Sequence, residues 1–319
     1  MQTYLDFEKP VAELEGKIAE LKSLSSTDQA VSIDEEVDRL SARAEEALAD
    51  IYRKLSPWQK TQVARHPQRP HFSDYLKGLI TEWTPLAGDR KFGEDQALLA
   101  GFGRFDGQPV AVLGQEKGNT TETRLKHNFG MANPEGYRKA VRVMDMADRF
   151  NIPVLSFVDT AGAYPGIEAE ERGQAEAIAR STEKSLDLGV PNLAIVIGEG
   201  GSGGAIAIAT ANRVLMLEHS IYTVASPEAA AAILWKDAGR AQDAATNMKI
   251  TAQDLLGFGV IDGIITEPVG GAHRKPEAVM DSTRTAIADF LSSFSGNRGR
   301  LEVREHRREK FLAMGSQLG

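Results

Sequence analysis

The chain has 319 residues, of which 42% are hydrophobic and 26% charged, and its formal net charge at pH 7 is −8. This length and apolar content suffice for one large core with appendages or for two modest cores. The acidic balance argues against a nucleic-acid-binding protein, which usually needs a net basic face. The absence of cysteine excludes disulfides, thiolate nucleophiles and cysteine-ligated zinc. The six histidines show no local metal-binding spacing, so we expect no metal in this chain.

The N-terminal segment is acidic and lacks the apolar stretch of a secretion signal. No apolar run approaches the roughly eighteen residues that a membrane-spanning helix needs. We therefore expect a cytoplasmic protein that contacts neither membrane nor nucleic acid.

Residues 1–95 are predicted to form a helical arm followed by a connector. Two segments carry apolar residues at helical spacing: Val11, Leu14, Ile18 and Leu21, then Val37, Leu40, Ala44, Leu48 and Ile51. Residues 23–30 are predicted to form the turn between them, and Ser32 with Glu35 to form a capping box for the second helix. The apolar stripe needs a partner surface, either in this chain or on another subunit. Residues 56–95 are predicted to be a connector with one short helix.

Residues 96–285 alternate short strands with helices, which predicts an α/β core. Asp106-Gly107 predicts the turn of a hairpin, and Asn133-Pro134 predicts the start of a helix. The other elements expected in chain order are strand 154–158, a long helix ending near 188, strands 193–197, 214–217 and 221–225, helix 227–235 and strand 260–265. Residues 286–319 are expected to form a basic C-terminal helix over about 301–314.

The segment NLAIVIGEGGSGGAIAIATA, residues 192–211, is a short apolar strand that passes through a glycine cluster into a helix. Five glycines lie between Gly198 and Gly204. Each lowers stability through the backbone entropy that it loses on folding. Such a loop leaves backbone N–H groups accessible at a helix N-terminus, where unpaired donors and the helix dipole favour negative charge. The segment therefore predicts a site that binds an anion or stabilises an oxyanion.

Two known sequence motifs offer interpretations of this loop. Gly198, Gly200 and Gly203 fit the GxGxxG dinucleotide fingerprint. That fingerprint belongs to the first strand–helix turn of its domain, however, and this loop follows an earlier strand–helix unit. The loop is not a phosphate-binding P-loop either, because the Lys-Ser/Thr pair is missing. Alternatively, the GxSxG pattern around Ser202 fits a serine hydrolase, with Asp262 and His273 as later triad members. Against the hydrolase, His273 lies in an expected loop, and a small serine also fits a crowded turn.

A third interpretation uses only the backbone. The amides of Gly203 and Gly204, at the start of the helix, would stabilise a developing oxyanion without any side-chain nucleophile. Losing one such donor typically lowers the rate about 10²- to 10³-fold.

Several long blocks of the sequence resemble a known family. They are HNFGMANPEGYRKA (127–140), DTAGAYPGIEAEERGQAEAIAR (159–180), VIGEGGSGGAIAIA (196–209) and SPE (226–228), with VARHPQRP (63–70), LAGDR (86–90) and GGAHRKPEA (270–278). In this order they resemble the carboxyltransferase alpha subunit of bacterial multi-subunit acetyl-CoA carboxylase. The resemblance covers nearly the whole chain.

The resemblance implies a crotonase-like core of repeated ββα turns with an N-terminal helical arm and a C-terminal helix. It implies an α2β2 assembly with a separate β subunit. The implied reaction moves CO₂ from carboxybiotin on a biotin carboxyl carrier protein, charged by biotin carboxylase, to acetyl-CoA and yields malonyl-CoA for fatty acid synthesis. A carboxyltransferase for another acyl-CoA is an alternative, and a non-catalytic interaction subunit is another.

In that reaction the amides of Gly203 and Gly204 would bind the ureido oxygen of biotin. Five further residues are expected to shape the cleft: Gly162, Ala163, Gly200, Gly201 and Ser202. Lys117 and Arg142 are weaker candidates for contacts with CoA or biotin. The sequence departs from the family's usual pattern at Ala161, Gln115 and Ala229-Ala230.

Overall fold

The structure is a computed structural model that describes residues 3–24, 30–296 and 299–316. The strands are β1 (Thr81–Pro85), β2 (Leu98–Phe105), β3 (Gln108–Gln115), β4 (Val154–Thr160), β5 (Asn192–Gly201), β6 (Arg213–Leu217), β7 (Ile221–Thr223) and β8 (Gly263–Ile265). The α-helices are α1 (Lys9–Leu24), α2 (Ala30–Arg53), α3 (Pro57–Ala64), α4 (Phe72–Leu79), α5 (Thr121–Lys126), α6 (Pro134–Arg149), α7 (Ile167–Glu171), α8 (Gln174–Asp187), α9 (Ser202–Ala209), α10 (Pro227–Trp235), α11 (Ala241–Asn247), α12 (Ala252–Gly257), α13 (Pro276–Ser293) and α14 (Arg300–Ala313). The short 3₁₀ helices are η1 (Asp6–Glu8), η2 (Asn128–Gly130) and η3 (Ala238–Arg240).

One mixed sheet organises the chain, with the strand order β1-β2-β3-β4-β5-β6-β8 and β7 added beside β5. The first three strands pair antiparallel, and β3 to β6 and β8 pair parallel. The parallel strands β4 and β5 are buried along their whole length. Their carboxyl ends therefore lie next to each other at one edge of the sheet, where α/β proteins commonly bind ligands.

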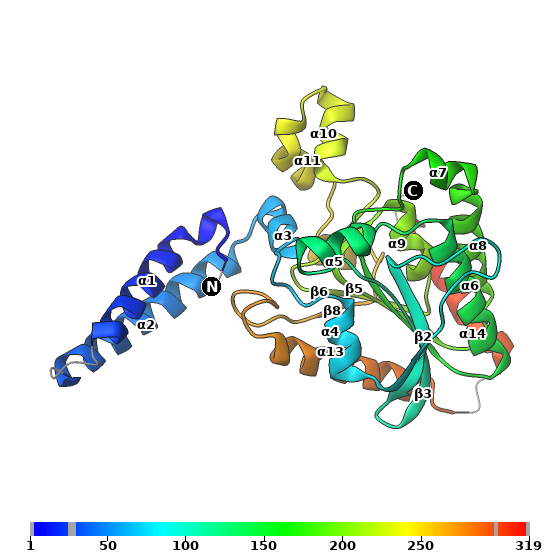
Figure 1. Cartoon of the computed structure of the whole chain (residues 1–319), viewed down its shortest axis with the longest axis horizontal. Helices are drawn as coiled ribbons and strands as arrows, with labels where there is room; N and C mark the ends of the chain where they lie inside the picture. The colour runs from blue at the N-terminus through cyan, green and yellow to red at the C-terminus, as the bar shows by residue number, and fades with distance from the viewer. Residues whose placement is uncertain (1–2, 25–29, 297–298, 317–319) are drawn as a thin grey trace.

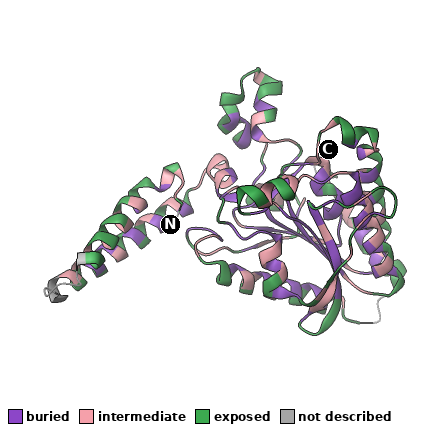
Figure 2. Ribbon diagram, in the orientation of Figure 1, coloured by how far each residue is buried: buried purple, intermediate pink, exposed green. Residues whose placement is uncertain are grey.

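Helices cover both faces of the sheet, as Figure 1 shows for α4 and α13 on one side and α6, α8 and α14 on the other. The alternation along β4 explains this arrangement. Val154 and Val158 pack with α6, α8 and α9, whereas Leu155 and Phe157 pack with the aromatic side chains of α4 and α13. Figure 2 accordingly shows the strands as the most buried part of the chain.

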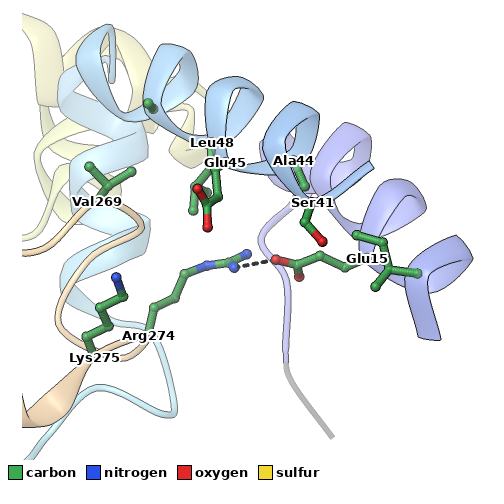
Figure 3. A pocket seen from close by; sticks show the side chains of 10 residues that line it. Glu15, Ser41, Ala44, Glu45, Leu48, Val269, Arg274 and Lys275 are labelled. Carbon is green, nitrogen blue, oxygen red and sulfur yellow. Dashed lines mark hydrogen bonds and ion pairs between the residues drawn. The ribbon is translucent and has the colours of Figure 1, made fainter. Parts of the chain in front are cut away.

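The N-terminal arm is a hairpin of α1 and α2 that projects from the core (Figure 1). Its apolar stripe packs mainly within the hairpin: Leu48 and Tyr52 of α2 cluster with Val11 of α1. The Arg274 guanidinium also reaches the arm, with Nη1 2.8 Å from Oε1 of Glu15 across a cavity of 650 Å³ (Figure 3). The arm thus finds its partner surface largely in this chain.

The hairpin at Asp106-Gly107 and the helix starting at Pro134 are confirmed. The capping box at Ser32 is wrong, because α2 begins at Ala30, and residues 25–29 of the expected turn lie outside the described residues. The long helix ending near 188 is interrupted at Gly173, which adopts a left-handed φ of 81° between α7 and α8.

The connector differs from its prediction of one short helix, since it holds α3, α4 and the strand β1. β1 precedes residue 95 but pairs with β2, and α13 runs across residue 285. The division of the chain at residues 95 and 285 stays a prediction.

Candidate functional site

The glycine segment lies at the end of β5, where this strand leads directly into α9. The strand extends through Gly201, four residues beyond its predicted end, and the helix begins at Ser202. Ser202 adopts a left-handed φ of 53°, which is uncommon for a residue other than glycine. Such strained conformations cluster at active sites and ligand clamps.

Close packing against the loop after β4 explains several of these glycines. A Cβ at Gly204 would lie 2.7 Å from the backbone N of Ala163, and one at Gly201 would collide with the carbonyl of Ala161. A Cβ at Gly198 would lie 2.5 Å from Oδ1 of Asp159. Two loops that are distant in the sequence therefore meet backbone to backbone.

Gly203 differs from these glycines, because packing within the chain does not require it. A Cβ there would lie 3.5 Å from Cγ2 of Ile178, an ordinary contact distance. The amides of Ser202, Gly203 and Gly204 come first in α9 and have no carbonyl of their own helix to bond. No side chain or loop carbonyl of the described residues accepts a hydrogen bond from the Gly203 or Gly204 amide. These amides are therefore left with donor capacity at the point where the sequence predicts an anion.

The other predicted cleft residues lie around this point. Gly162 faces α9, since a Cβ on it would lie 3.8 Å from Cβ of Ser202. Its own amide donates to Oγ1 of Thr160 at 3.1 Å, so it is not a free donor. Gly200 is buried beside the ring of Tyr222. Ala163 thus lies in the loop after β4, and Gly200, Gly201 and Ser202 lie at the junction of β5 and α9. Their contacts with a ligand stay predictions.

The structure does not assemble the catalytic triad of a serine hydrolase. Asp262 accepts a hydrogen bond from the Val214 amide at 2.6 Å and pairs with Lys310. The His273 ring stacks on His66, with centroids 3.7 Å apart. Both predicted partners of Ser202 are therefore engaged elsewhere.

A buried cluster of charges lies at the same edge of the sheet. The ammonium of Lys117 is 2.9 Å from Oδ1 of Asp159 and 3.2 Å from Oε2 of Glu199. Arg65 joins the cluster through Glu199 and through Glu228 in the first turn of α10, at 2.6 Å in each case. The carboxylates of Asp159 and Glu199 are each only 4% exposed. The cluster therefore links α3, the ends of β4 and β5, and α10.

Mutual attraction keeps these buried groups charged. Burial alone would raise the pKa of Asp159, but Lys117 and His71 hold it well below the usual range. The pKa of Glu199 is likewise lowered by Lys117 and Arg65 in spite of burial. Burial would lower the pKa of Lys117, but the two carboxylates raise it above its ordinary value. The paired charges fix the positions of both strand ends.

A cavity of 220 Å³ opens beside this cluster. Its walls are formed by Ala64, Arg65, His66, Pro67, His71, Lys117, Gly118, Arg124, Phe129, Asp159, Ala161 and Glu199. It includes the charged cluster and the start of the loop after β4, but not Gly203 or Gly204. Lys117, a weak candidate in the sequence, lines this cavity, whereas Arg142 does not.

Sequence reasoning missed the roles of Asp159 and Glu199. The available signal was their placement, because each carboxylate lies at or inside a strand that is otherwise apolar. Unpaired charges are almost never buried in this way. Such a pair at neighbouring strand ends should have predicted a buried cation partner.

Within the described part of the chain, no group of three or more His, Asp or Glu side chains could hold a metal ion. Among the same residues, no helix has the length and apolar character to cross a membrane.

Comparison with known proteins decides the family. A family model described as "Acetyl co-enzyme A carboxylase carboxyltransferase-like" matches residues 4–315. The chain belongs to this family. A relative from Nitrobacter winogradskyi is 69% identical over 319 residues, covering 100% of this chain and 99% of its own, and one from Methylobacterium nodulans is 68% identical over 318 residues, covering 100% of both. Both are named "Acetyl-coenzyme A carboxylase carboxyl transferase subunit alpha".

Solved structures support the fold of this carboxyltransferase family. Transcarboxylase 12S matches with a TM-score of 0.59 and 19% identity over 72% of this chain and 42% of its own. A Pseudomonas malonate decarboxylase hetero-dimer matches with a TM-score of 0.55 and 18% identity over 70% of this chain and 89% of its own. The predictions of an α/β crotonase-like fold and of a carboxyltransferase are confirmed, and nothing in these comparisons favours the hydrolase or dinucleotide interpretations.

Proposed function

We propose that the chain is the alpha half of a two-subunit carboxyltransferase that moves CO₂ from carboxybiotin to acetyl-CoA and forms malonyl-CoA for fatty acid synthesis. The names of the full-length relatives support this substrate and this division into subunits. The proposed partners are a β subunit in an α2β2 assembly, a separate biotin carboxyl carrier protein, and the biotin carboxylase that charges it. The proposed location is the cytoplasm.

The observation that carries the proposal is the pair of amides at Gly203 and Gly204. Carboxybiotin that loses CO₂ develops negative charge on its ureido oxygen. Backbone donors held rigidly at a helix N-terminus stabilise such a charge without reorganising during the reaction. A Cβ would fit at Gly203, so packing within the chain does not account for the glycine at this position.

The remaining groups would position these donors. Gly162 and Ala163 meet the junction of β5 and α9 near Gly201, while Gly200 packs on Tyr222. The charged cluster of Lys117, Asp159 and Glu199 fixes the two strand ends. No side-chain nucleophile is needed, so Ser202 contributes shape only.

The test is malonyl-CoA formation by the purified chain mixed with a carboxyltransferase β subunit and carboxylated carrier protein. We expect turnover from the mixture and almost none from the chain alone. Ser202→Ala should retain most of the activity. Ester hydrolysis by the chain alone that is lost in Ser202→Ala would instead establish the hydrolase.

A further inference from the structure

A second cavity lies away from the glycine segment, between the outer sides of α6 and α8 and the loop that precedes β2. Its volume is 490 Å³, within the range of small-molecule sites. It is lined by Asp89, Arg90, Lys91, Arg138, Val141, Arg142, Asp145, Glu176 and Arg180. Five of these nine side chains are basic and three are acidic.

Each of the three acidic side chains already has a cationic partner. Asp89 pairs with Arg138 at 2.7 Å, and Glu176 lies 3.4 Å from Arg180. Asp145 pairs at 2.7 Å with Lys184. Each acid that lines the cavity is therefore paired with a cation other than Arg90, Lys91 or Arg142.

Three cations remain, namely Arg90, Lys91 and Arg142. None of them forms an ion pair among the described residues. The Nε of Arg142 is buried without a hydrogen-bond partner, and its Nη2 donates only to the carbonyl of Ala87 at 2.9 Å. Burial and the nearby charge of Arg90 lower the pKa of Arg142 more than the opposing charges of Glu94 and Asp89 raise it, so Arg90 and Arg142 repel each other. Glu94 and Asp89 are already paired with Lys139 and Arg138.

The loop that carries two of these cations is held in place. Oδ1 of Asp89 accepts hydrogen bonds from the amides of Lys91, Phe92 and Gly93 at 2.8 to 3.0 Å. Arg90 adopts a left-handed φ of 64° within this loop. The cations are thus presented from a fixed backbone and not from a flexible tail.

The cavity between the arm and the core offers a contrast. There Arg274 pairs directly with Glu15, and the carboxylate of Glu45 lines the same space as Lys275 (Figure 3). Its two cations face two acids, whereas Arg90, Lys91 and Arg142 face none that is free.

We propose that the cavity formed by α6, α8 and residues 86–93 binds a ligand that carries phosphate groups, with Arg90, Lys91 and Arg142 as its charged contacts. Phosphate oxygens accept bidentate hydrogen bonds from arginine and would satisfy the buried Nε of Arg142. A multiply charged anion would also remove the repulsion among the three cations. The phosphates belong either to a coenzyme A moiety or to a small phosphorylated molecule.

Calorimetric titration of the full chain with inorganic pyrophosphate, coenzyme A and dephospho-coenzyme A tests the site. We expect binding that weakens with added salt, and at least tenfold weaker binding in Arg142→Gln and in Arg90→Gln. Arg149→Gln removes an exposed charge from the same helix and should bind as the unchanged chain does. Absence of binding by pyrophosphate and coenzyme A, or equal weakening in Arg149→Gln, would overturn the proposal.

The same titrations separate the two sources. Tighter binding of coenzyme A than of dephospho-coenzyme A and pyrophosphate identifies the coenzyme, whereas equal binding of pyrophosphate identifies a small phosphorylated ligand. A thermal melt without ligand is the second readout: Arg142→Gln and Arg90→Gln relieve repulsion and should not lower the melting temperature, whereas a merely structural role predicts a loss. Because neither experiment uses the β subunit or turnover, their failure leaves the carboxyl-transfer proposal untouched.

Discussion

The edge of the sheet at β4 and β5 and the N-terminal hairpin are held by different kinds of contact. At the sheet edge, loops distant in the sequence touch through their backbones, and two buried carboxylates share the ammonium of Lys117. In the hairpin, two neighbouring helices pack apolar side chains on each other and reach the core through a few contacts such as Arg274 with Glu15. We therefore expect substitutions at the sheet edge to lower the unfolding free energy more than substitutions in the hairpin do.

The largest loss of unfolding free energy is expected from Lys117→Met. It leaves Asp159 and Glu199 buried without their shared cation, and breaking a buried pair typically costs about 3–5 kcal/mol. Urea denaturation monitored by circular dichroism measures the free energy of unfolding.

Lys184→Met is the matched control, because both lysine side chains are 16% exposed, but the nearer partner of Lys184, Asp145 at 2.7 Å, is 53% exposed. Its second partner, Asp148 at 3.6 Å, keeps an ion pair with Arg300 when Lys184 is replaced. We expect a loss of about 1 kcal/mol or less for Lys184→Met. Equal losses in the two variants would refute the distinction between the buried cluster and an ordinary surface pair.

A smaller loss of unfolding free energy is expected from Gly204→Ala. The added Cβ would lie 2.7 Å from the backbone of the loop after β4, and such overpacking typically costs about 1–3 kcal/mol. Gly203→Ala has room at 3.5 Å and should change the unfolding free energy much less. Denaturation of both variants side by side decides the matter, and a Gly203→Ala variant as unstable as Gly204→Ala would show that packing requires both glycines.

The effect that is smallest at neutral pH concerns the junction of the arm and the core. Burial, together with the charges of His66, Arg69 and Arg274, lowers the pKa of His273 from 6.5 to about 3. Below pH 6.5 the unfolded chain binds a proton there that the folded chain does not, so the unfolding free energy falls as pH drops from 6.5 towards 3 and is retained above 6.5.

His273→Phe tests this linkage, because it keeps a ring for stacking on His66 and removes the titrating group. Its unfolding free energy should depend less steeply on pH between 6.5 and 3, as followed by denaturation at a series of pH values. An unchanged slope would assign the pH dependence to other groups.

Local pattern was enough to predict the hairpin, the turn at Asp106-Gly107 and the helix starts at Pro134 and Pro227. These features depend on residues that are close in the sequence, such as the Ser226 side chain that accepts a hydrogen bond from the Ala229 amide at 3.1 Å. The passage from strand to helix at the glycine segment was predicted for the same reason, since its composition is unusual within a few residues.

The features that local pattern did not predict depend on contacts between residues far apart in the sequence. The ion pair between Lys117 and Glu199 joins residues 82 positions apart, and the β1–β2 pairing inside the expected connector depends on a neighbouring strand. The glycines at 198, 201 and 204 are explained by a loop some forty residues earlier, which no local pattern predicts. Sequence therefore indicated which backbone could bind an anion, but not what holds it in place.

The central claim is that the Gly203 amide donates a hydrogen bond to a charge that develops during carboxyl transfer. Gly203→Pro removes this N–H in the first turn of α9, and Gly203→Ala keeps it. The decisive measurement is the rate of malonyl-CoA formation by the two variants with the β subunit, at matched fold and assembly. We predict a rate about 10²- to 10³-fold lower for proline than for alanine; equal rates would contradict the account.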